Sequence, residues 1–152
     1  MDKYFSVIDV ETTWANEVMS IGVVIADCES KDVIESRYYI VEPECNMGGM
    51  FSSELMYPGA KVYLKSDREH VIEDIREYLD SRKVNKIFAY NASFDKNCLP
   101  ELGCYSWYDI MRLAAYKQYN KMIPDNVECC GTGRMKRGYG VEQIYRRDKD
   151  AR

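Results

Sequence analysis

The sequence predicts an α/β domain in which a mixed central sheet is flanked by helices. Three strand-like runs come first and are joined by short polar connections, which indicates an antiparallel meander. Helical and strand-like patterns then alternate, and this combination implies a mixed sheet. The chain has 152 residues, of which 46% are hydrophobic and 30% charged, so one globular domain with a substantial core is expected.

The three predicted strands cover residues 4–9, 18–26 and 33–41. Each is rich in β-branched and aromatic side chains, which favour strands. Glu42-Pro43 ends the third strand. Residues 44–64 contain a Gly-Gly pair and a Pro-Gly pair and predict a long irregular loop. A loop of this length inside a compact domain is often functional.

The elements after the loop alternate between helices and strands. Ser66-Asp-Arg-Glu69 has the spacing of a capping box and predicts the start of the first helix. Apolar residues from Val71 to Leu79 then recur at helical spacing. The remaining predicted elements are a strand over 86–90, a helix from about 93 to before Pro100, a strand over 105–108, a helix over about 109–116 and a last helix over 139–147.

The net charge of −4 argues against tight, nonspecific binding to nucleic acid. The charge is uneven, because residues 1–130 carry 14 Lys or Arg against 22 Asp or Glu, whereas residues 131–152 carry 7 against 3. The basic C-terminal segment is suited to meeting a phosphate backbone. By charge alone it is equally well explained as a solvated helix with a frayed tail.

Several classes of protein are excluded by the composition. No apolar run approaches the ~20 residues that span a bilayer, and the N-terminal Met-Asp-Lys-Tyr is not a signal peptide. The six cysteines include no Cys-x-x-Cys pair, so reduced thiols are expected rather than a disulfide framework or a zinc site. These features predict a cytoplasmic location.

The apolar run Tyr4–Ile8 ends in Asp9, and a second acid, Glu11, follows two residues later. Alternate residues of a strand share a face, so both carboxylates would aim at one point. Such a pair suits a hard divalent cation such as Mg²⁺ and hints at metal-dependent phosphodiester chemistry. The same Asp-x-Glu spacing recurs at Asp27 and Asp67, where a turn and a first helical turn explain it. The strand context therefore distinguishes Asp9 from the other two pairs.

A second acid-bearing segment, Ala89–Asp95, follows the strand predicted over 86–90. Asp95 would lie at the start of a helix on the carboxyl edge of the sheet, where ligands of α/β proteins gather. Asn91 would fix the turn or hydrogen-bond a substrate, and Phe94 would offer an apolar or stacking surface. Taken alone, the segment is better explained by a helix N-terminal acid, a turn residue and a core aromatic.

Together these segments resemble the DEDD-type 3′→5′ exonucleases of the ribonuclease H-like superfamily, which include the proofreading subunit of the bacterial replicative DNA polymerase. That family carries Asp-x-Glu at the end of its first strand, here Asp9 and Glu11, and an Asn-x-x-Phe-Asp motif, here Asn91 to Asp95. The order of elements agrees. Trp107–Asp109 and Gly138–Tyr145 resemble later segments of the family, so the resemblance spans nearly the whole chain.

The resemblance implies two-metal hydrolysis of phosphodiester bonds at single-stranded DNA or RNA 3′ ends. Asp9 would bridge two divalent cations, Mg²⁺ or Mn²⁺, while Glu11 would bind one of them and Asp95 would help to hold the other. The terminal nucleotide would lie beside three residues, Thr12, Asn91 and Phe94. A proofreading role would add a DNA polymerase as a partner.

The family also needs a fourth metal-binding Asp, preceded by a His or Tyr that acts as general base. The single histidine, His70, falls in the first predicted helix and is expected at the surface. Three explanations stay open, of which we favour the first. In the first, residues 1–152 are one exonuclease-like domain that is truncated at its C-terminus. In the second, Tyr145 and Asp150 form a shortened third motif. In the third, the domain is a degenerate exonuclease that binds nucleic acid or a protein partner without cutting.

Overall fold

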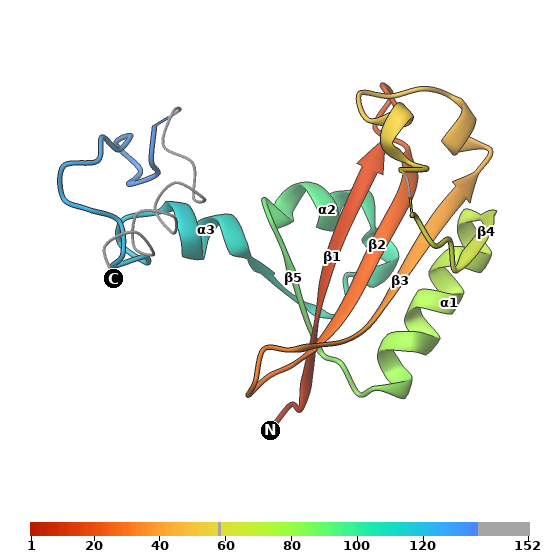
Figure 1. Cartoon of the computed structure of the whole chain (residues 1–152), viewed down its shortest axis with the longest axis horizontal. Coiled ribbons are helices and arrows are strands. Elements are labelled where there is room, and N and C mark those ends of the chain that lie inside the picture. Colours follow the sequence, from red (N-terminus) through yellow and green to blue (C-terminus); the bar gives the residue numbers. More distant parts are fainter. Residues whose placement is uncertain (58, 137–152) are drawn as a thin grey trace. The chain divides into compact units, whose positions relative to one another are not determined.

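A computed structural model of the protein describes residues 1–57 and 59–136 (Figure 1). The chain divides into two compact units, Met1–Tyr108 and Asp109–Arg152, and each is described by itself. The first unit carries the central sheet and both of the acid-bearing segments that the sequence singles out. It is therefore the unit that positions the candidate site.

A mixed sheet forms the centre of the first unit, with six strands in the described residues and the order β4-β3-β2-β1-β5-β6. β1, β2 and β3 form an antiparallel meander, whereas β5 is parallel to β1 and β4 is parallel to β3. The predicted mixed sheet is confirmed. The strands span Tyr4–Thr12 (β1), Val18–Asp27 (β2), Val33–Glu42 (β3), Leu64–Asp67 (β4), Lys86–Ala89 (β5) and Ser106–Asp109 (β6).

The sequence prediction is wrong in two details near residue 66. It expects a loop and then a helix start over Leu64–Asp67, but this segment forms β4 by pairing with β3. The capping box does not form either. Asp67 is the N-cap of the first helix and accepts a hydrogen bond from the backbone N–H of His70 at 3.1 Å. Ser66 is still part of the strand, so the helix begins after it. The His70 side chain is exposed, as predicted.

The helices otherwise follow the predicted order. α1 (Arg68–Ser81) buries the apolar residues that the periodicity indicates, and α2 (Ala92–Cys98) follows β5. α3 (Ile110–Ala115) opens the second unit, where Asp109 caps it by accepting from the N–H of Met111 at 3.0 Å. The helix predicted over 139–147 lies outside the described residues. The part of the chain that the structure describes also contains three short 3₁₀ turns: η1 (Glu44–Asn46), η2 (Ser52–Glu54) and η3 (Pro100–Leu102).

The main core of the first unit lies between the sheet and α1. Ile8 and Val10 of β1 are buried in it together with the apolar face of α1. Side chains alternate along a strand, so Asp9 and Glu11 point to the opposite face of the sheet. The burial of their neighbours therefore fixes the direction in which the two acids project.

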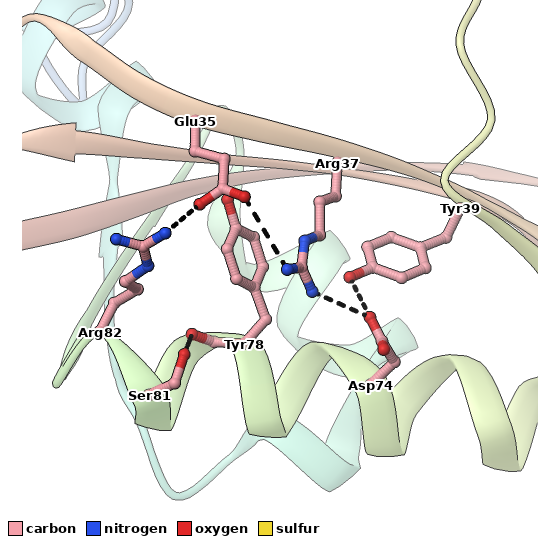
Figure 2. Close-up of polar contacts among 7 residues, drawn as sticks. All are labelled: Glu35, Arg37, Tyr39, Asp74, Tyr78, Ser81 and Arg82. Carbon is pink, nitrogen blue, oxygen red and sulfur yellow. Dashed lines mark hydrogen bonds and ion pairs between the residues drawn. The ribbon is translucent and has the colours of Figure 1, made fainter.

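A polar cluster joins β3 to α1 beside this core (Figure 2). The guanidinium of Arg37 lies between the rings of Tyr63 and Tyr78, 4.1 and 3.8 Å from their centroids. Arg37 also donates to the carboxylate of Asp74 at 3.3 Å, and the hydroxyl of Tyr39 donates to the same carboxylate at 2.6 Å. Because side chains of α1 contact the Arg37 guanidinium of β3, the cluster fixes the position of α1 on the sheet.

The second unit is described over residues 109–136. It has a small apolar cluster that packs α3 against the segment after it, formed by Met111, Ala115, Ile123, Val127 and Met135. All six cysteines of the chain lie in the described residues, where they are free thiols. Over residues 1–57 and 59–136, no helix has the length and apolar character needed to cross a membrane.

Candidate active site

Two acids project from the end of β1 on the face turned away from the main core. Asp9 is exposed and Glu11 is half-buried. Their partners across β2 are small, because Asp9 pairs with Gly22 and Glu11 pairs with Ser20. Small neighbours leave room for a ligand beside the two carboxylates.

α2 brings a third acid to the same place. Asn91 precedes the helix in the left-handed region, with a φ of 63°, which asparagine tolerates better than most residues. Asp95, in the first turn, is buried with 3% of its surface exposed, and its Oδ1 accepts a hydrogen bond from the backbone N–H of Val10 at 3.1 Å. Asp95 therefore contacts the residue that lies between Asp9 and Glu11, although 85 positions separate the two in sequence.

Neighbouring carboxylates affect the ionisation of Glu11 at this edge. Although Asp9 is exposed, the protein around its carboxylate removes part of its hydration, and this desolvation raises the pKa of Asp9. Burial also raises the pKa of Glu11, and the negative charges of Asp9, Glu54 and Asp95 raise it further. Glu54 lies in η2, inside the long loop after β3, and sequence reasoning missed it because no regular spacing relates a loop residue to a strand. The length of that loop was the one signal that pointed towards it.

The other predicted site residues divide into those the structure describes and those it does not. Thr12 is half-buried at the end of β1, next to the acids. Asn91 and Phe94 are exposed at the start of α2, and the carbonyl of Asn91 accepts from the N–H of Phe94 at 3.0 Å. Tyr145 and Asp150 lie outside the described residues. That Thr12, Asn91 and Phe94 bind substrate stays a prediction.

The donors at this edge suit a hard cation in their chemistry. All are carboxylate oxygens, and a positive charge would relieve the repulsion that raises the pKa of Glu11. Within residues 1–57 and 59–136, no three His, Cys, Asp or Glu side chains converge closely enough to hold a metal ion by themselves. Some hard cations are held in proteins by one or two carboxylates together with waters and substrate phosphates, and a site of that kind does not need three converging side chains.

Solved structures of 3′-exonucleases share this fold. The chain matches a 3′-exonuclease that recognises the 3′ end of a histone mRNA stem-loop with a TM-score of 0.59, at 17% identity, over 81% of this chain and 64% of that one. It matches E. coli Exonuclease I in complex with a dA16 oligonucleotide with a TM-score of 0.58, at 16% identity, over 95% and 36%. The zinc-bound form of the E. coli ExoI–ssDNA complex gives 0.54, at 14% identity, over 99% and 40%.

The chain has the ribonuclease H-like fold of these exonucleases, as the sequence predicts. At 14–17% identity these likenesses show the fold alone. The matched region spans 64%, 36% and 40% of the three solved chains. No family model matches the sequence, and no curated protein sequence is detectably similar to it. Fold and site together define a protein with a nuclease fold and a group of carboxylates at the end of its first strand.

Proposed function

We propose that this protein is a metal-dependent 3′→5′ exonuclease, a hydrolase that removes nucleotides from single-stranded DNA or RNA ends. The observation that carries the proposal is the hydrogen bond between Asp95 and the N–H of Val10, which brings Asp95 to the strand end that bears Asp9 and Glu11. The fold shared with 3′-exonucleases supports it. In this proposal the chain belongs with the DEDD-type exonucleases that its motifs resemble.

The three acids have distinct parts in the proposed reaction. Asp9 and Glu11 would hold Mg²⁺ or Mn²⁺ on the face turned away from the core, and Asp95 would contribute a further carboxylate while its bond to Val10 keeps the strand end in place. Two bound cations would supply an activated water and stabilise the attacking and leaving oxygens of the phosphodiester. The small residues opposite the acids on β2 leave space for the phosphate, and the general base stays unassigned within the described residues.

The terminal nucleotide is proposed to lie between the ends of β1 and β5. Thr12 would contact it from β1, while Asn91 and Phe94 would contact it from α2. Of the similar structures, one is a complex with a dA16 oligonucleotide and another concerns a histone mRNA stem-loop, so both DNA and RNA ends belong to the proposal. A DNA polymerase partner, closer kinship with proofreading subunits and a cytoplasmic location rest on the sequence alone and stay predictions.

The first test is to incubate the whole chain with 5′-labelled single strands and Mg²⁺ or Mn²⁺ at physiological salt. We expect shortening from the 3′ end. Asp9→Ala should slow it by more than about a hundredfold, because losing even an outer-shell partner of a metal ligand costs 10–100-fold. Asp95→Asn should also lose activity yet stay folded, since its amide oxygen still accepts from the N–H of Val10.

Glu29→Gln is the matched control for these variants. Glu29 is an exposed acid in the turn between β2 and β3, at the opposite end of β1 from Asp9, so its loss should leave the rate unchanged. Binding of the strands with no shortening by the whole chain would contradict the exonuclease proposal. That result would favour the alternative, a catalytically degenerate module that binds nucleic acid or a protein partner.

A further inference from the structure

Apolar side chains are exposed beside the acids, on the side away from α2. Trp14, in the turn between β1 and β2, has 71% of its surface exposed. Met47, Met50 and Phe51, in the loop after β3, are exposed to 55%, 68% and 42%. We refer to Trp14, Met47, Met50 and Phe51 as the loop patch. Large apolar side chains gathered in solvent mark interaction sites more often than single ones do.

Backbone contacts hold both halves of the loop patch to the end of β1. The N–H of Trp14 donates to the carbonyl of Gly48 at 3.3 Å. Gly49 packs so closely on Thr12 and Thr13 that a Cβ there would collide with the Thr12 carbonyl oxygen. The Oγ1 of Thr13 accepts from two backbone N–H groups of the same turn, at 3.1 and 3.2 Å. The patch is therefore fixed to the strand that carries the acids.

The loop patch and α2 approach the acids from opposite sides. In the sheet, β2 and β3 lie on one side of β1 and β5 lies on the other. The loop patch belongs to the turn between β1 and β2 and to the loop after β3, so it lies on the β2 and β3 side. Phe94 and Asp95 belong to α2, which follows β5. Figure 1 shows the loop after β3 near the end of β1. Glu54, three residues after Phe51, is close enough to Glu11 for its negative charge to raise the pKa of Glu11.

We propose that the loop patch binds the unpaired bases of the strand upstream of the terminal nucleotide, by stacking on Trp14 and Phe51. This inference rests on the proposed function, because the acids define where the phosphodiester lies. Residues 1–130 carry 22 acidic against 14 basic residues, so this part of the chain attracts phosphates weakly, and contacts to the bases would add affinity there. Aromatic side chains stack on any base whose face is free. Within a duplex the faces of each base are covered by the stacked neighbouring base pairs, so the patch selects single strands.

The test measures binding rather than cutting. A 5′-fluorescent 12-nucleotide strand is titrated, by anisotropy, with the Asp9→Ala protein and with the same protein carrying Trp14→Ala or Phe51→Ala. Each added change should weaken binding by at least about fivefold, the lower end for one base stacked on an aromatic ring. Val33→Ala is the control within the same unit, because Val33 is 65% exposed and pairs with Ala26 at the end of the sheet opposite to Trp14, so its loss should leave the affinity unchanged.

A strand with abasic sites at the four positions upstream of the 3′ nucleotide separates stacking from other causes. On that strand Trp14→Ala and Phe51→Ala should have no effect, because there is no base to stack. Unchanged affinity of the Trp14→Ala and Phe51→Ala proteins for the normal strand, equal losses on both strands, or no strand binding at all would overturn the inference. The two proposals can fail separately. If strand binding depends on the loop patch but the whole chain never shortens a strand, this inference stands and the exonuclease activity is refuted.

Discussion

Glu11 is half-buried one residue before the end of β1, and the charges of Asp9, Glu54 and Asp95 add to the effect of burial on its pKa. The folded protein therefore binds a proton at Glu11 more tightly than the unfolded chain does. Its ionised form is unfavourable to folding, and its partner across β2 is the small, uncharged Ser20. A carboxylate kept where its own charge opposes folding is typical of functional sites.

Glu11→Gln should raise the melting temperature at pH 7, because the amide keeps the shape of the side chain and removes the unfavourable charge. With a pKa raised in the folded state, the stability that protonated Glu11 contributes is present below its ordinary pKa of 4.5 and is lost as the pH rises through the raised value. The gain from Gln should therefore shrink as the pH falls towards 4. Thermal melts of both proteins from pH 4 to 8 check this, and a gain that is equal at every pH would contradict it.

At the scale of elements, one guanidinium joins β3 to α1. Arg37 is held by two aromatic rings and by Asp74, and 20% of its side chain is exposed. Arg82, the residue that follows α1, donates to Glu35 of β3 at 2.7 Å, but its side chain is more exposed, at 43%. Figure 2 shows both arginines at the same junction, where each pairs with Glu35. They differ mainly in how far their side chains are enclosed. The enclosed pairing should contribute more to stability than the exposed one.

Arg37→Lys should lower the free energy of unfolding by about 1–2 kcal/mol, because an ammonium loses the stacking on two rings and the planar hydrogen-bond geometry. Arg82→Lys, the control at the same junction, should change it by less than about 0.5 kcal/mol. Urea unfolding of both variants gives the comparison. Equal losses would mean that the two rings contribute nothing beyond the ion pair.

At the scale of the whole molecule, the proposed cation binding should be linked to stability. A cation that binds only the folded protein stabilises it by about 2.7 kcal/mol at one hundred times its dissociation constant. For a domain of this length that corresponds to a rise of roughly 5–10 °C in melting temperature. Titration with Mg²⁺ or Mn²⁺ at pH 7 should show this rise in the unmodified chain and not in Asp9→Ala. The same rise in both proteins would place the cation elsewhere.

The sequence reveals the elements whose pattern is local and misses what depends on distant partners. The alternation in β1 and the helical spacing of α1 can be recognised from neighbouring residues alone. The order of the two acid motifs is also visible in the sequence. β4 has only four residues, and its pairing with β3 makes it a strand. The bond from Asp95 to Val10 and the approach of Glu54 to Glu11 depend on how the chain returns to β1, which no spacing records.

Gly49 divides the loop after β3 into two parts with different freedom to change. At Gly49 any side chain would collide with the end of β1, so this point holds the loop in register with the acids. The outer residues on either side, such as Met47 and Phe51, face solvent and meet no such restriction. Under the proposed function, exchanging those outer residues should change which strands the protein accepts and leave the proposed hydrolysis at the acids unaltered. The loop would then be a place where substrate choice can be engineered separately from catalysis.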